Sequence, residues 1–323
     1  MNAENSVLKL ENLSVSLPLS SGETVYVVDG LSLDIKPGQR LGLVGESGCG
    51  KSMSVAAATG LLPSQAETGG AIYLDGEDVS KHRQEEWQRI RGRTVASIGQ
   101  QPMNALNPYF KIGAQLLDML KRCRGISKRA AKVELLQAFS DVQLPNPDSI
   151  LMRYPQQLSG GQLQRVMIAL AIACRSKLLI ADEPTTALDV TVQAEIVDLL
   201  DRLCNEHQIA LLFISHDLPL VSELCDYIAV MYAGRIMEFG SAEEIVARPR
   251  HPYSRALIDC APVIGRDSLQ PILGSMPTVT QKRDRCHFAD RCSYVSERCR
   301  QETPQVDSSG VACFFPLALG DQR

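Results

Sequence analysis

The stretch GESGCGKS, residues 45–52, decides the fold of this 323-residue chain. It follows an apolar segment, LGLV at 41–44, and opens a helical pattern from Ser52 to Leu62. The pattern G-x-x-x-x-G-K-[ST] between a strand and a helix is typical of a phosphate-binding loop, and a glycine-rich turn with an incidental lysine would not explain both flanks. Lys51 would neutralise the β and γ phosphates, and Ser52 would ligate Mg²⁺. Nucleotide contacts are expected from Gly45, Ser47, Gly48, Cys49, Gly50, Lys51 and Ser52.

A second apolar strand, LLIADE at 178–183, ends in two adjacent acids. Ligands of an α/β sheet bind at the carboxyl ends of its strands. Asp182 is therefore expected to face Mg²⁺ through water, and Glu183 to polarise the water that attacks the γ-phosphate. An Asp-Glu pair is common in solvated turns and gains meaning only beside the loop. The two segments together predict ATP and Mg²⁺ as cofactors.

The composition is that of an ordinary globular protein, with 45% hydrophobic residues and a net charge of −4. The longest apolar run, at 166–174, is shorter than the roughly 20 residues that cross a bilayer. Residues 1–10 lack the basic and apolar segments of a secretory signal. The acidic balance gives no general reason to expect nucleic acid as a partner. The sequence therefore predicts neither a membrane span nor a signal peptide.

The order of strand and helix patterns predicts an α/β fold with a mainly parallel sheet covered on both faces. Expected strands are 7–15, 25–28, 41–44, 71–74, 178–182, 210–215 and 227–231, and expected helices are 52–62, 114–123, 128–139, 162–173, 191–206 and 218–225. A turn at Ala233 and Gly234 indicates a hairpin. We expect a nucleotide-binding domain at 1–250 with a helical insertion at about 101–174, followed by a small cysteine-rich extension at 251–323.

Four further motifs accompany the phosphate loop. LSGGQ at 158–162 precedes a helical pattern, Gln100 stands in SIGQQP, ALD occupies 187–189, and His216 follows the strand ALLFIS. In this order they resemble the signature, the Q-loop, the D-loop and the switch histidine of ATP-binding cassette (ABC) ATPases. The resemblance covers about residues 7–240. It implies a P-loop NTPase fold, with a RecA-like core, an antiparallel β subdomain and an α-helical insertion.

The resemblance also implies how ATP is bound and hydrolysed. Two cassettes of this family pair head to tail, and the signature of each reaches the γ-phosphate held by the other. Gln100, preferred to Gln101 because it stands two residues before a proline, would sense Mg²⁺ and water, while its loop touches a membrane partner. His216 would hold Glu183 and the water, which makes Glu183, His216 and Gln100 the expected catalytic residues. The expected contacts of the shared site are Ser159, Gly160, Gly161, Gln162 and Asp189, and the expected Mg²⁺ ligands are Ser52, Gln100 and Asp182.

An aromatic residue from the first strands is expected to stack on adenine. Tyr26 is the only aromatic residue before the phosphate loop, although the usual position in the family lies nearer Leu17. The alternative is that Tyr26 is a strand residue packed on the sheet. Tyr26 is the candidate that the sequence offers.

Three strings resemble the dipeptide, oligopeptide and nickel importer branch of the family: PMNALNP at 102–108, TTALDVTVQAEI after Glu183, and HPYSRALIDCAP at 251–262. The branch implies an ATPase subunit that works with a second cassette, identical or paralogous, and with two permeases and an external solute-binding protein. It would lie peripherally at the cytoplasmic face of the inner membrane. The alternative, an ABC ATPase that acts on DNA or ribosomes, normally has long coiled coils or two cassettes in one chain.

Four of the ten cysteines crowd into the last forty residues, at Cys286, Cys292, Cys299 and Cys313. The order is similar to the C-terminal extension of the importer branch, although Arg285 and Asp290 replace its usual glycine and proline. In a reducing compartment such a cluster points to a metal site. The spacing lacks the tight C-x2-4-C pair of structural zinc, so a [4Fe-4S] cluster is the preferred prediction. Zinc and unliganded thiols remain the alternatives, and His287 is expected to be a neighbour of the site.

Overall fold

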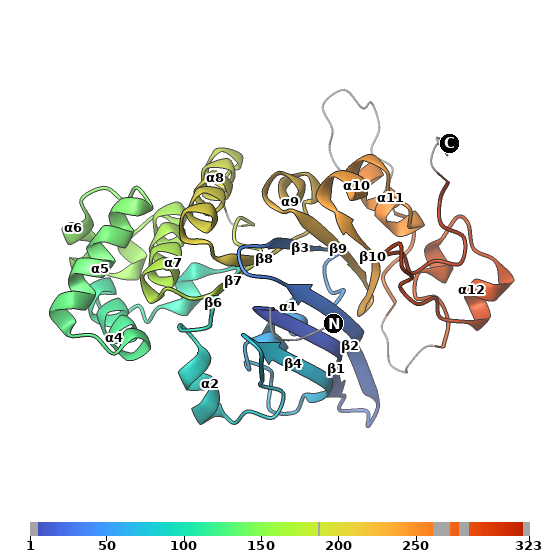
Figure 1. Ribbon diagram of the computed structural model, residues 1–323, viewed down its shortest axis with the longest axis horizontal. Coiled ribbons are helices and arrows are strands. Elements are labelled where there is room, and N and C mark those ends of the chain that lie inside the picture. Colours follow the sequence, from blue (N-terminus) through green and yellow to red (C-terminus); the bar gives the residue numbers. More distant parts are fainter. Residues whose placement is uncertain (1–5, 187, 261–271, 278–283, 319–323) are drawn as a thin grey trace.

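The computed structural model describes residues 6–186, 188–260, 272–277 and 284–318. Within these residues the chain forms a six-stranded sheet beside a four-stranded antiparallel sheet (Figure 1). The larger sheet has the order β10-β9-β3-β8-β7-β6, and all its strands are parallel except β10. Its strands are β3 (Arg40–Val44), β6 (Val95–Ile98), β7 (Leu178–Asp182), β8 (Ala210–Ser215), β9 (Tyr227–Tyr232) and β10 (Arg235–Ser241). The expected α/β fold is therefore confirmed.

The smaller sheet, in the order β2-β1-β4-β5, consists of β1 (Leu8–Pro18), β2 (Thr24–Ile35), β4 (Glu67–Leu74) and β5 (Glu77–Asp78). One apolar core lies between this sheet and the larger one, and a second joins the larger sheet to the helices. Residues of β3 serve both cores in alternation, because Leu41 and Leu43 face the first core and Val44 the second. Every residue of β8 is buried, as its central place in a parallel sheet requires.

The helices form three groups. Helices α1 (Lys51–Ala58), α2 (Gln84–Ile90), α8 (Val190–His207), α9 (Leu218–Leu224) and α10 (Ala242–Ala247) accompany the sheets. An all-helical region consists of α3 (Pro102–Ala105), α4 (Ile112–Arg124), α5 (Lys128–Asp141), α6 (Pro147–Met152) and α7 (Gly160–Cys174). The end of the chain carries α11 (Pro252–Cys260) and α12 (Glu297–Gln301). The helical region and the end of the chain lie at opposite ends of the long axis (Figure 1).

One expected helix had the wrong end, and one strand was not predicted. The helix expected at 52–62 ends at Ala58, because Gly60 takes a left-handed φ of 64° and any Cβ there would lie 2.3 Å from the Trp87 ring. Strand β6 was not predicted, since only its first and last residues, Val95 and Ile98, are buried. A four-residue segment with only its ends buried shows no alternation of apolar and polar residues, so the sequence gives no strand signal there. The segment becomes a strand because it pairs with β7.

The predicted hairpin is confirmed, with Ala233 and Gly234 both at positive φ between β9 and β10.

The C-terminal extension is attached to β10. The buried carboxylate of Glu238 on β10 accepts hydrogen bonds from the backbone N–H groups of Arg250 (2.8 Å) and His251 (2.9 Å). These bonds secure the start of α11.

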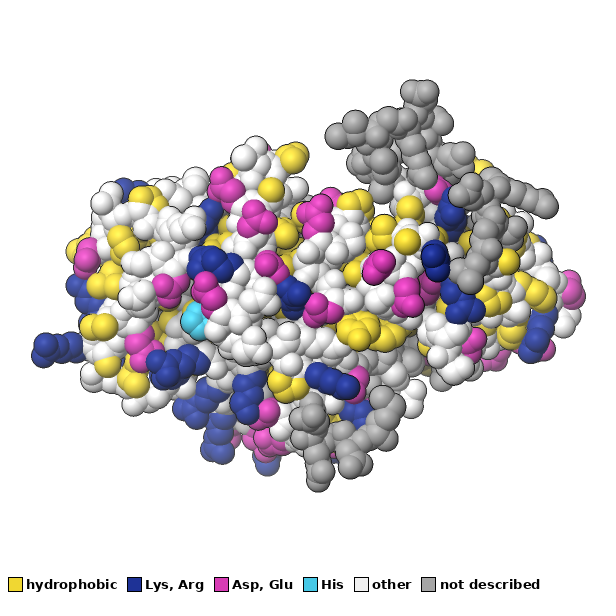
Figure 2. Space-filling view, turned by 45° about the horizontal axis from the view of Figure 1, so that its top comes forward, with side chains coloured by type: hydrophobic (Ala, Val, Ile, Leu, Met, Phe, Trp, Pro, Cys, Tyr) yellow, Lys and Arg dark blue, Asp and Glu magenta, His cyan; other side chains and the backbone are white. Residues whose placement is uncertain are grey.

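The described helices include none that is long and apolar enough to span a membrane. Basic and acidic side chains are interspersed over most of the face in Figure 2.

Candidate functional site

The phosphate loop turns between the end of β3 and the start of α1, as predicted. Gly50 takes φ 111°, and a Cβ there would lie 2.4 Å from the carbonyl oxygen of Val27. A Cβ on Gly45 would lie 2.1 Å from the carbonyl oxygen of Met231. Both positions therefore require glycine, since strands β2 and β9 hold the loop from outside.

Lys51 closes this loop from within. Its side chain is buried, and its Nζ donates to the carbonyl oxygens of Gly45 (2.7 Å) and Glu46 (3.1 Å). Cys49 is also buried, and burial raises the pKa of its thiol. The loop is thus preformed around the ammonium group that the predicted phosphates would meet.

Two of the three predicted magnesium ligands, Ser52 and Asp182, lie together. Ser52 Oγ on α1 donates to Asp182 Oδ1 at the end of β7, over 3.4 Å. Burial raises the pKa of Asp182, and the neighbouring Glu183 adds to the rise. A hydroxyl and a carboxylate are oxygen ligands of the kind that Mg²⁺ prefers.

The expected catalytic residues gather around one oxygen, Glu183 Oε2. Gln100 Nε2 donates to it over 3.2 Å and Thr186 Oγ1 over 3.1 Å, while His216 Nδ1 lies 3.8 Å away. Glu183 has φ 47°, and its backbone N–H donates to the carbonyl oxygen of Ile214 on β8. Thr186 was not predicted; its only sequence signal was its place three residues after Glu183.

The LSGGQ segment forms the exposed start of α7. Ser159 Oγ accepts a hydrogen bond from the N–H of Gln162, and Gln162 Oε1 accepts one from the N–H of Ser159. A Cβ on Gly161 would lie 2.9 Å from Val192 on α8, so this glycine permits close packing. Helices α7 and α1 lie apart (Figure 1), so this helix end and the phosphate loop occupy different places on the chain.

The D-loop segment leads into α8. Asp189 Oδ1 caps this helix by accepting from the N–H of Val192 at 3.0 Å. Ala187, the first residue of the motif, lies outside the described residues.

Tyr26, the candidate for stacking on adenine, lies on β2 and is half-buried against the core. Its backbone stands one residue before Val27, whose carbonyl oxygen lies next to Gly50.

The four C-terminal cysteines share one neighbourhood. Cys286 and Cys299 are buried, and the backbone N–H of Cys286 donates to the carbonyl oxygen of Cys299. Burial raises the pKa of Cys286 and of Cys292 to about 11, and the neighbouring thiols, Cys313 included, add to the rise. Over the described ranges, no three His, Cys, Asp or Glu side chains gather closely enough to hold a single metal ion. His287 lies against Ala233, whose carbonyl oxygen is 2.8 Å from its Nδ1.

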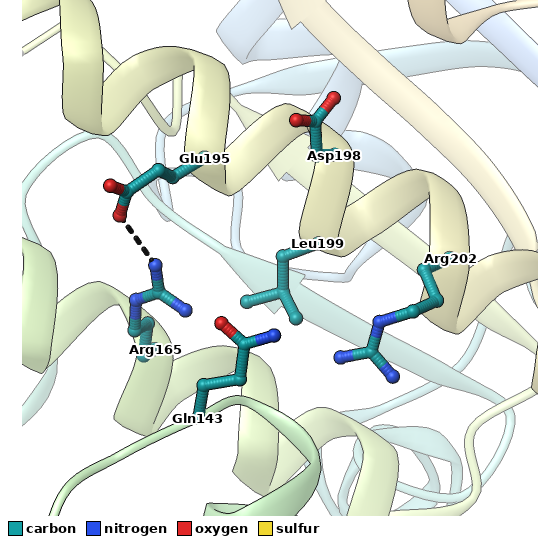
Figure 3. Close-up of a pocket in the computed structure, with 6 residues that line it drawn as sticks. All are labelled: Gln143, Arg165, Glu195, Asp198, Leu199 and Arg202. Carbon is teal, nitrogen blue, oxygen red and sulfur yellow. Dashed lines mark hydrogen bonds and ion pairs between the residues drawn. The ribbon is translucent and has the colours of Figure 1, made fainter.

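A separate polar pocket of about 240 Å³ lies between the helical region and α8 (Figure 3). Both of its arginines bind the C-terminal end of α5: Arg165 donates to the carbonyl oxygen of Val142 (2.9 Å) and Arg202 to that of Asp141. Arg165 also pairs with Glu195 at 2.7 Å. The pocket is lined by Gln143, Arg165, Glu195, Asp198, Leu199 and Arg202. Because the side chains of Arg165 and Arg202 are engaged in these bonds, we interpret the pocket as a contact between the helical region and the core.

The sheet order, the preformed phosphate loop and the paired Ser52 and Asp182 define a P-loop ATPase. Residues 28–186 match the family "ABC transporter", and residues 237–299 match "Oligopeptide/dipeptide transporter, C-terminal region". The chain belongs to the ABC transporter ATP-binding proteins of the oligopeptide/dipeptide family. It is an ABC ATPase, the subunit of an import system that hydrolyses ATP to drive transport.

Among curated proteins, the probable D,D-dipeptide transport ATP-binding protein DdpD of Escherichia coli K12 is 42% identical over 96% of this chain and 97% of its own. The dipeptide transport ATP-binding protein DppD of the same organism is 40% identical over 97% of each chain.

Among solved structures, the dimeric bacterial ABC transporter cassette MJ0796 matches 73% of this chain and 98% of its own, at 26% identity and a TM-score of 0.64. The protein cbiO1 from Clostridium perfringens, part of the transporter complex cbiONQ, matches 76% of this chain and 92% of its own, with a TM-score of 0.64. These matches confirm the cassette fold that the sequence motifs indicated.

Proposed function

We propose that this chain binds Mg²⁺-ATP between two cassettes and uses its hydrolysis to import di- or oligopeptides or a similar small solute. The observation that carries the proposal is the gathering of Gln100 and His216 around Glu183, one residue after Asp182. In this arrangement Glu183 polarises the attacking water, while Gln100 and His216 position Glu183 and report on the γ-phosphate. The match of residues 237–299 to the C-terminal region of peptide transporters supports the class of solute.

The test of the catalytic assignment is Glu183→Gln, which keeps the size of the side chain and removes its charge. We expect unchanged ATP binding, hydrolysis reduced by about 10²-fold or more, and accumulation of a closed dimer in the assembled transporter. Hydrolysis at the normal rate would refute the role of Glu183. Lys51→Ala is the matched control, because it should abolish the binding that Glu183→Gln preserves.

The nucleotide contacts are those predicted in the phosphate loop, with Tyr26 as the residue that stacks on adenine. Ser159 and the N–H groups at the start of α7 would serve the nucleotide of the partner cassette, identical or paralogous, because a helix N-terminus attracts phosphate. Mixed dimers test this. A Ser159→Ala change in one cassette should impair hydrolysis at the partner's phosphate loop more than at its own.

The remaining partners would be two permeases, with the chain peripheral at the cytoplasmic face of the inner membrane. Exposed apolar side chains occur in the segment after Gln100, at Met103, Tyr109 and Phe110, and they support docking of a permease there. Movement of Gln100 with nucleotide state would then be passed to the permease. An external binding protein would deliver the solute. We take residues 1–250 as the cassette and 251–323 as the extension.

Action on DNA or ribosomes is the alternative, and it is disfavoured. The face in Figure 2 mixes both charges, whereas nucleic-acid binders concentrate positive charge. The importer-type C-terminal match also has no place in that alternative.

The four cysteines of the extension would hold a [4Fe-4S] cluster. Four thiols supply the donor set that this cluster needs, and their mutual effect on pKa supports a common site. The expected role is structural. Anaerobically purified protein should be brown and contain iron; a folded, colourless, iron-free sample would refute the cluster, and bound zinc would support the alternative.

A further inference from the structure

The C-terminal extension reaches the phosphate loop at one residue, Glu46. The guanidinium of Arg291 holds its carboxylate in a bidentate pair, with Nη1–Oε2 at 2.6 Å and Nη2–Oε1 at 3.0 Å. The two residues are 245 positions apart in the sequence. The Arg291 side chain is only 5% exposed, so water screens this pair weakly.

Arg291 is itself held rigidly. It donates to the carbonyl oxygens of Leu273 (2.9 Å) and Ile272 (3.2 Å), and to Tyr232 Oη (3.3 Å). With the two bonds to Glu46, all five of its N–H groups have acceptors. The hydrogen bond to Glu46 is the largest of the influences that raise the pKa of Arg291 above its usual value, so the guanidinium stays charged. The guanidinium is therefore a fixed positive charge beside the loop.

The backbone of Glu46 is fixed from the same side. Its N–H donates to Tyr253 Oη on α11 over 3.0 Å, and Tyr253 is fully buried. Its carbonyl oxygen accepts from Lys51. Hence the extension binds both the backbone N–H and the carboxylate of Glu46, while Lys51 of the loop binds its carbonyl oxygen.

The charge of Glu46 presents a physical difficulty. The loop must receive an anionic nucleotide, yet it carries a carboxylate that is 28% exposed. An unneutralised carboxylate would repel phosphate and compete for Lys51. We propose that Arg291 is a positioning residue for nucleotide binding, which neutralises and orients Glu46 so that the phosphate loop keeps its affinity for ATP and ADP. The C-terminal extension is thereby part of the nucleotide site.

The test measures binding of Mg²⁺-ADP to the full-length chain by calorimetry, and therefore needs neither permease nor transported solute. Arg291→Gln keeps hydrogen-bonding capacity and removes the charge, so the Kd should rise about tenfold. Glu46→Gln leaves Arg291 unneutralised and should lower the Kd about threefold or more. The double variant should return to near the wild-type value. Arg298→Ala, which removes an exposed pair with Glu302 in the same extension, should leave the Kd unchanged.

If the Arg291–Glu46 pair acted only as a clamp, that is, only by holding the extension in place, the result would be different. Both single variants would then weaken binding, and the double variant would be no better than either. That outcome, or a wild-type Kd for Arg291→Gln, would overturn the proposal. If Arg291→Gln fails to fold, Glu46→Gln decides alone, because the proposal requires tighter binding and a clamp requires weaker binding. Melting temperatures of all variants identify loss of fold.

Discussion

Gln100, just after β6, donates a hydrogen bond of 3.2 Å to the carboxylate of Glu183, just after β7, a residue 83 positions further along the chain. The contact exists because β6 and β7 are adjacent and parallel, so that their carboxyl ends meet at one edge of the sheet. The bond restricts the carboxylate that we propose to act on water. It also joins this carboxylate to the loop that leads to the exposed residues Met103 and Tyr109.

We therefore expect Gln100→Ala to reduce kcat about ten- to a hundredfold with little change in nucleotide affinity, since the phosphate loop is untouched. Steady-state ATPase assays of the assembled transporter measure both quantities. Gln101→Ala is the matched control, because Gln101 makes its side-chain bond to Asn104 instead. Equal losses for the two variants would contradict the special role of Gln100.

The two glycines at positive φ in the phosphate loop differ in the space around them. Gly50 has φ 111° and lies against Val27, whereas a Cβ on Gly48, at φ 81°, would meet nothing within 4 Å. Gly50→Ala should therefore lower the free energy of unfolding by about 3 kcal/mol or more, and Gly48→Ala by about 1 kcal/mol. Urea unfolding of both variants tests the difference. Equal losses in the free energy of unfolding would show that backbone strain alone creates the requirement for glycine at these positions.

His251 makes stability depend on pH. It is fully buried, and burial lowers its pKa to about 3 from the ordinary value near 6.5. The unfolded chain therefore binds a proton between pH 6.5 and pH 3 that the folded chain does not, so the free energy of unfolding should fall as the pH falls. The expected loss is about 1.4 kcal/mol per pH unit below pH 6.

Urea unfolding at pH 7, 6 and 5 measures this slope, and His251→Asn is the control. Asparagine can accept the bond that His251 Nδ1 accepts from the N–H of Tyr253, but it does not titrate. The variant should lose less stability than the wild type over this range. Parallel curves would assign the pH dependence to other groups.

The contacts of Arg165 in the pocket between the helical region and α8 are expected to stabilise the folded chain. Arg165 is 13% exposed, binds the carbonyl oxygen of Val142 and pairs with Glu195. Arg165→Met keeps most of the volume and removes both interactions, so the free energy of unfolding should fall by about 1–3 kcal/mol. Arg122→Met, in an exposed pair with Asp118, should change it by less than about 0.5 kcal/mol. Similar values for the two would contradict a connecting role for the pocket.

Much of the fold could be predicted because its signals are local. Strands β7 and β8 were predicted with their observed ends, because each is a continuous apolar run that ends at a polar residue. The half-buried strand β6 and the early end of α1 were missed. Both depend on neighbours distant in sequence, namely β7 and Trp87.

The sequence alone determined the chemistry of the nucleotide site. The glycines, Lys51 and Ser52 stand in one continuous loop, and Asp182 and Glu183 end one strand, so residue type and order suffice to recognise them. Only the tertiary structure decided what surrounds that loop. Arg291 and Tyr253 reach Glu46 because β10 anchors the extension through Glu238, and no periodicity or spacing encodes such a contact. Ion pairs between distant segments depend on how whole elements pack, and packing is a property of the folded chain.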